Sequence, residues 1–148
     1  MEFTLSLEQA LLKESANRFA KETLGFAGRA ARRDKAAVQW RKFCDMGWIA
    51  AGIAPERGGF GGVVEMALIA QELGQVLAIE PYLGCGVLAP QLLLAASGTA
   101  HVESDALLAA VCAGETRAAA AVSEPEGRGG SRLGWHACQI GARLCPHR

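Results

Sequence analysis

The first apolar stripe of the chain repeats with the period of a helix. It occupies positions i, i+4, i+7 and i+8, namely Leu12, Ala16, Phe19 and Ala20. Ser6 precedes this stretch and Gln9 follows it three residues later, which is the pattern of a capping box. The pattern predicts an amphipathic helix that begins at Leu7, packs by one face and ends at Gly25.

A second helix is predicted to end at Gly47. Its apolar face stands at i, i+3, i+4 and i+7: Trp40, Phe43, Cys44 and Gly47. Gly47 is a natural residue to follow the helix, because glycine enters the left-handed region without a Cβ penalty. Asp34 is the expected cap at the other end, and a basic stretch from Phe26 to Arg33 connects this helix to the first.

The segment from Trp48 to Ile53 is too short and too interrupted by glycine for another long helix. We expect an extended link that buries Trp48 and Ile53. Two glycine pairs follow, Gly58-Gly59 and Gly61-Gly62. Glycines at this density let the backbone turn tightly and pass close to another group. That group is either another segment of the chain or a ligand, and the residues leave both possibilities open.

A third helix is predicted after the glycines. Its apolar positions recur at helical spacing and are Val63, Met66, Ala67, Ala70, Leu73 and Leu77. Its polar residues are Glu65, Gln71, Glu72 and Gln75. The pattern places these polar residues mostly on the solvent side.

Two further helices follow a break at Pro81. The first is rich in leucine and alanine, is bent or restarted at Pro90 and stops at Gly98; its apolar character all round predicts burial on several sides. Ser104 is expected to cap a short fifth helix that ends at Gly114. Five helices in about 115 residues predict an all-α helical bundle.

Composition and charge bear on which partners the chain binds and on the compartment in which it occurs. Lysine plus arginine equals aspartate plus glutamate at 15 each, so the zero net charge predicts no nucleic-acid ligand. The run from Pro81 to Val102 carries no charge, but glycine and proline interrupt it, which predicts a buried helix rather than a membrane span. Five cysteines without C-x-x-C spacing, and no secretory signal, predict reduced thiols in a cytoplasmic protein.

Four phrases occur in the order found in one enzyme family. They are FTLSLEQALLKESANRF, Gly47-Trp48 with Pro55 and the glycine pairs, ALIAQELG, and Ser-Glu-Pro at Ser123. Together they resemble the acyl-CoA dehydrogenases, flavoproteins that desaturate acyl-CoA thioesters. The resemblance implies an N-terminal helical domain over residues 1–116. It also implies the first strand of a middle β-domain over residues 117–125, although the alanines there favour helix.

The resemblance implies FAD as the cofactor and acyl-CoA as the substrate. Ser123 matches the position whose hydroxyl hydrogen-bonds the flavin ring, and Val122 matches a backbone contact to it. Where the family often has a second serine for the pyrophosphate, this chain has Gly129, with Ser131 two residues beyond. On the residues alone, Ser-Glu-Pro also fits an ordinary turn at a strand end.

The catalytic base of the family is a glutamate of a C-terminal helical domain, and no segment of this sequence matches it. We therefore expect no catalytic residue here and no activity from the chain alone. Expected partners are a homo-oligomer or a full-length dehydrogenase subunit. The alternative function is a non-catalytic helical interaction module that docks on a full-length dehydrogenase, because apolar faces would otherwise be exposed.

Residues 126–148 lose the family pattern and show no sustained period of helix or strand. We interpret them as an irregular, disordered tail that arises from truncation or an out-of-frame continuation. The absence of β-domain coding in the following bases, in any frame, would contradict this hypothesis. The tail holds two thiols and two imidazoles, His136, Cys138, Cys145 and His147. Their H-x-C and C-x-H spacing is unusual for zinc, so no metal site is predicted.

Overall fold

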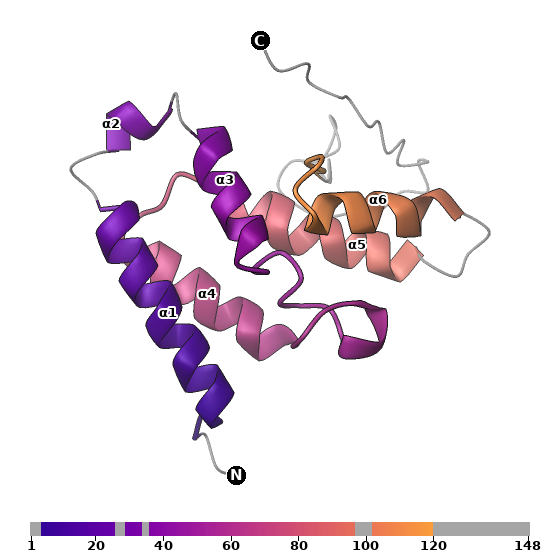
Figure 1. Cartoon of the computed structure of the whole chain (residues 1–148), viewed down its shortest axis with the longest axis horizontal. Coiled ribbons are helices and arrows are strands. Elements are labelled where there is room, and N and C mark those ends of the chain that lie inside the picture. Colours follow the sequence, from indigo (N-terminus) through magenta and orange to yellow (C-terminus); the bar gives the residue numbers. More distant parts are fainter. Residues whose placement is uncertain (1–3, 26–28, 34–35, 97–101, 120–148) are drawn as a thin grey trace, which may run out of the picture.

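The chain is described by a computed structural model over residues 4–25, 29–33, 36–96 and 102–119. These residues form packed helices with no strand among them, so the predicted all-α bundle is confirmed (Figure 1). The elements are α1 (Leu7–Thr23), α2 (Arg29–Arg32), α3 (Ala36–Asp45), the 3-10 turn η3 (Pro55–Arg57), α4 (Val63–Gln75), the π-helical η4 (Tyr82–Leu88), α5 (Ala89–Ala96) and α6 (Val102–Cys112).

Helix α1 begins where its capping box predicts. The Gln9 N–H donates to Ser6 Oγ at 3.2 Å, and the Ser6 N–H donates to Gln9 Oε1 at 3.0 Å. Two of the free amides at the helix start are thereby satisfied. The helix ends at Thr23, slightly before Gly25. The predicted cap Asp34 of the second helix lies outside the described residues.

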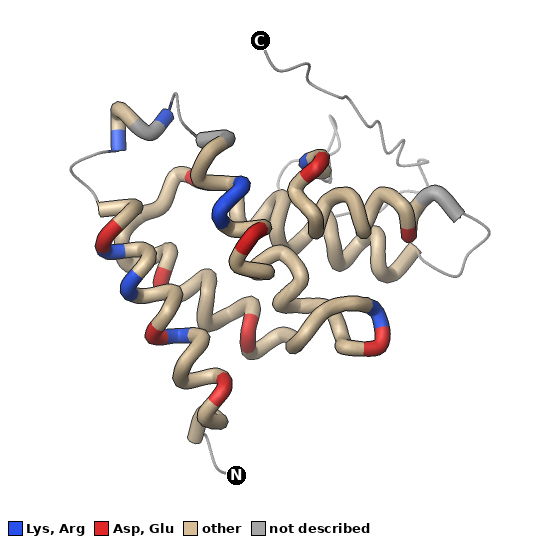
Figure 2. Tube along the Cα trace, in the orientation of Figure 1, with Lys and Arg blue, Asp and Glu red and all other residues tan. Residues whose placement is uncertain are grey.

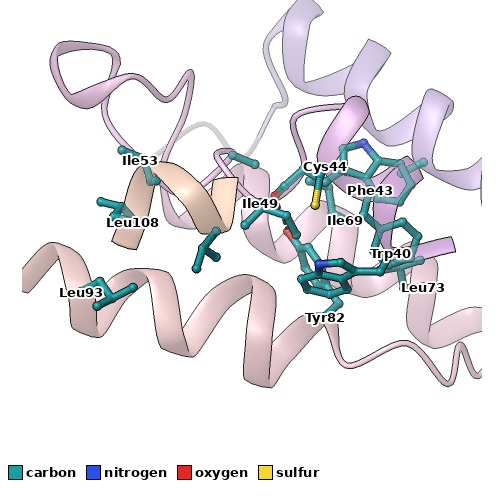
Figure 3. Packing of buried hydrophobic residues seen from close by; sticks show 14 of the residues in the cluster. Trp40, Phe43, Cys44, Ile49, Ile53, Ile69, Leu73, Tyr82, Leu93 and Leu108 are labelled. Carbon is teal, nitrogen blue, oxygen red and sulfur yellow. Dashed lines mark hydrogen bonds between the residues drawn. The ribbon is translucent and has the colours of Figure 1, made fainter. Parts of the chain in front are cut away.

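An aromatic cluster around Phe43 joins four parts of the chain. Figure 3 labels Phe43 and Tyr82, two of its members, in the core. The Phe43 ring, on α3, lies 5.0 Å from Trp48 and 6.0 Å from Phe19 of α1, measured between ring centroids. It lies 6.3 Å from Tyr82 of η4 in an edge-to-face arrangement. Phe43 is completely buried. Aromatic pairs stabilise a fold beyond the burial of their apolar surface. The cluster therefore stabilises the packing of α1, α3 and η4 against one another.

The link after α3 is a run of turns, so the expected extended conformation is wrong. Gly47 has a φ of 72°, as its predicted role at the helix end requires. The Ala50 N–H then donates to the Gly47 carbonyl at 2.9 Å, and the Ile53 N–H donates to the Ala50 carbonyl at 3.1 Å. The buried residues of the run are Trp48, Ile49, Ala51 and Ile53. An extended segment turns alternate residues to opposite faces and would expose either Trp48 or Ile49.

The two C-terminal helical segments differ from expectation. Leu83, Leu88 and Leu92 are 66%, 39% and 43% exposed, so the apolar segment over η4 and α5 is buried on one side only. The expected stop at Gly98 lies outside the described residues. Helix α6 begins at Val102, which places Ser104 inside the first turn, where it is buried and cannot act as the N-cap.

The end of α6 agrees with its prediction. The helix stops at Cys112, and Gly114 follows with a φ of 73°. Arg117 to Ala119 then form neither helix nor strand, and the rest of the expected strand lies outside the described residues. Across the described residues, no helix is both long enough and apolar enough to cross a membrane.

A polar seam joins α1 to α4, and it contains a carboxylate that the sequence pattern grouped with the solvent side. Glu72 is only 1% exposed. Its Oε2 accepts hydrogen bonds from Asn17 Nδ2 at 2.5 Å and from Gln75 Nε2 at 2.9 Å. The Lys13 ammonium lies 4.0 Å from Oε1. Polar partners on α1 therefore allow this carboxylate to be buried.

The same seam links the starts of the two helices. Gln9 Nε2 donates to Glu65 Oε1 at 2.9 Å, and Glu65 Oε2 accepts from the Gly62 N–H at 2.8 Å, at the start of α4. These hydrogen bonds stabilise the ionised carboxylate. The bond from Gln9, followed by the bond from the Gly62 amide, holds the pKa of Glu65 below its ordinary value of 4.5 against the opposing effect of burial.

This seam makes α1 packing sensitive to acid. Because the pKa of Glu65 is lower in the folded chain, its contribution to stability is complete above pH 4.5 and is lost as pH falls through the folded value. We expect Glu65→Gln to reduce the loss of stability that occurs as pH falls from 4.5 through the lower pKa of the folded chain. The change of stability with pH is measured from urea unfolding midpoints, followed by far-ultraviolet circular dichroism at several pH values. The exposed Glu14→Gln variant serves as the control and should keep the wild-type slope.

Candidate functional site

The glycine loop approaches the chain itself. The Gly59 N–H donates to the Ala54 carbonyl at 3.2 Å, and the Gly61 N–H donates to the Ile53 carbonyl at 3.3 Å. A Cβ at Gly59 would overlap the Ile53 carbonyl oxygen, and one at Gly61 would lie 2.6 Å from the Ala51 carbonyl oxygen. Of the two possibilities that the sequence left open, contact with another chain segment is therefore the one present.

An exposed apolar stripe runs along η4 and α5. Its residues are Leu83, Leu88 and Leu92. They are spaced by five and then four residues, which brings them to one side because a π-helical turn takes more residues than an α-helical turn. The opposite side holds the buried Tyr82 and Leu93. We call the three leucines the apolar stripe.

The inner side of η4 and α5 is held by specific contacts. The Tyr82 hydroxyl donates to the Trp48 carbonyl at 3.3 Å. Gln91 Nε2 donates to the Gly52 carbonyl at 2.8 Å. A Cβ at Gly86 would lie 2.9 Å from the Tyr82 ring, so this glycine allows the close packing. The apolar stripe is thus fixed outward by contacts to the turn run after α3.

The apolar stripe offers contact area and no ionised group. No charged residue occurs from Pro81 to Ala96, and Figure 2 shows α5 without charged positions. Burial raises the pKa of the Tyr82 phenol far above its ordinary range and also raises the pKa of the Cys85 thiol. Both groups are therefore neutral at physiological pH. The surface suits an aliphatic group, and it provides neither a general base nor an activated nucleophile.

A groove of about 580 Å³ lies between η3 and α6. Its floor includes Ile53, Leu108 and Cys112. At its rim, Arg57 Nη2 lies 3.0 Å from Asp105 Oδ1. Glu56 also lines the groove.

This rim does not fit the pyrophosphate of FAD. Asp105 already engages the guanidinium of Arg57, and the Glu56 carboxylate would repel a second anion. The apolar stripe has no charged group to meet a phosphate either. We therefore find no flavin site on these two surfaces of the described residues.

The residues predicted to contact the cofactor, Val122 and Ser123, lie outside the described residues. The four Cys and His residues of the tail, His136, Cys138, Cys145 and His147, lie outside them as well. Within the described part of the chain, no group of three or more His, Cys, Asp or Glu residues is arranged to hold a metal ion.

The apolar stripe itself was missed by sequence reasoning. The hydrophobic character of the whole segment predicts burial on all sides. It does not show that the helical period changes from π to α between η4 and α5. The signal available was the spacing of five and then four residues from Leu83 through Leu88 to Leu92. That spacing puts all three leucines on one side only if the segment starts as a π-helix.

A family model described as "Acyl-CoA dehydrogenase, N-terminal domain" matches residues 6–115. The chain belongs to the acyl-CoA dehydrogenase family. The match spans every described helix, from α1 to α6. It confirms the resemblance to this dehydrogenase domain that the sequence motifs of the helices and the glycine loop indicate. No curated protein and no solved structure gives a significant match to the chain.

The glycine loop generates a prediction about stability. Gly59→Ala forces a Cβ against the Ile53 carbonyl and is expected to destabilise the fold by about 3 kcal/mol. Gly74→Ala is the matched control, since a Cβ there meets nothing within 4 Å and glycine is a poor helix former. It should stabilise by up to about 1 kcal/mol. Urea unfolding measures the stability change of each variant. Equal changes for the two substitutions would contradict the close approach of Gly59 to the Ile53 carbonyl.

The rim of the groove generates a prediction about the cofactor. The resemblance assigns the flavin contact to Ser123, and we predict that any retention of flavin by the chain depends on this residue and not on the groove. We expect Ser123→Ala to lower the visible flavin absorbance that survives desalting after incubation with FAD, while Glu56→Gln leaves it unchanged. An increase with Glu56→Gln would show that the flavin phosphates lie in the groove.

Proposed function

We propose that this chain provides the N-terminal helical domain of an FAD-dependent acyl-CoA dehydrogenase, which desaturates acyl-CoA thioesters between the α and β carbons. In this proposal, the apolar stripe forms part of the wall against which the acyl chain lies. The observation that carries it is an exposed row of leucines, Leu83, Leu88 and Leu92, on a domain of this family.

The chemistry of the apolar stripe supports this role. An aliphatic chain gains about 0.8 kcal/mol for each methylene removed from water, and the stripe offers it aliphatic side chains without charge. At 1.5 Å per helical residue, the distance from Leu83 to Leu92 is about 13 Å, or slightly less where the helix is π. That length matches an extended acyl group rather than a single methyl.

The support beneath the apolar stripe also fits a binding wall. Gln91 is bonded to the Gly52 carbonyl and Tyr82 to the Trp48 carbonyl, so both ends of the segment are attached to the core. A surface held in this way loses little conformational entropy when a ligand binds.

The described residues contribute binding and orientation rather than proton transfer. The apolar stripe holds no carboxylate, so the α-proton must be removed by a group outside it. FAD, when bound, supplies the acceptor for the hydride. Assignment of Ser123 and Val122 to the flavin, division of the chain into residues 1–116, 117–125 and 126–148, and a cytoplasmic location all remain predictions.

A second candidate function is a helical interaction module that docks on a dehydrogenase subunit or assembles with its own copies. It is favoured by exposed apolar residues elsewhere, such as Leu7 on α1 at 77% and Val63 on α4 at 76%. Exposed apolar surface of this kind often marks a protein partner. This candidate predicts concentration-dependent assembly, which the first candidate does not require.

The proposed function predicts a preference for acylated CoA. In isothermal titration calorimetry, octanoyl-CoA should bind more tightly than free CoA, because the octanoyl chain buries area on the apolar stripe. Leu88→Asp places a carboxylate in the middle of the stripe and should weaken octanoyl-CoA binding about tenfold or more. Affinity for free CoA should stay the same.

Leu11→Asp is the matched control for this experiment. Leu11 is an exposed leucine on α1, at 56%, so the substitution introduces the same charge away from the apolar stripe. It should leave octanoyl-CoA binding unchanged, and circular dichroism should show that both variants keep the helical fold. The proposal that the acyl chain lies on the apolar stripe would be refuted by either of two results. One is equal affinity for CoA and octanoyl-CoA, and the other is an equal loss of octanoyl-CoA affinity in the two variants.

A further inference from the structure

We draw no further inference here: the strongest candidate, the groove between η3 and α6 with Ile53, Leu108 and Cys112 on its floor, carries nothing because no described residue shows what occupies it.

Discussion

The fold depends on the packing of one buried ring, that of Phe43. It touches aromatic side chains from α1, from the turn run after α3 and from η4, so three separate segments are positioned against a single group. Truncation of a buried phenylalanine typically costs about 3–5 kcal/mol, a large part of the stability of a domain this size. The glycine loop is placed by the same packing, because its partners Ala51 and Ile53 continue directly from Trp48.

The position of the apolar stripe follows from this core. Tyr82 turns inward to the aromatic cluster and to the Trp48 carbonyl, and the π-helical turn then directs the three leucines to the other side. Turns of this π-helical kind frequently occur at functional sites in proteins. The domain thereby combines a rigid inner side with an uncharged outer side. We propose that the uncharged outer side faces the acyl chain of the substrate.

The sequence predicted the features that depend on near neighbours. The Ser6 and Gln9 capping box, the left-handed Gly47 and the burial of Trp48 each follow from a few adjacent residues, and all are present. Features that depend on distant partners were missed. Glu72 is buried because Asn17 reaches it from α1, across 55 residues of sequence, which no helical pattern of α4 alone can reveal. The exposure of Leu88 was missed because the segment is apolar all round, and this pattern does not reveal which side has no neighbouring helix among the described residues.

The central claim is that the acyl chain lies on the apolar stripe, and photo-crosslinking tests it most directly. An acyl-CoA with a diazirine near the end of its chain would be bound to the full chain, irradiated and mapped by peptide mass spectrometry. The account predicts labelling between residues 83 and 92 that excess octanoyl-CoA suppresses. Labelling confined to α1, to α4 or to the groove at Cys112, with residues 83–92 unlabelled, would contradict it.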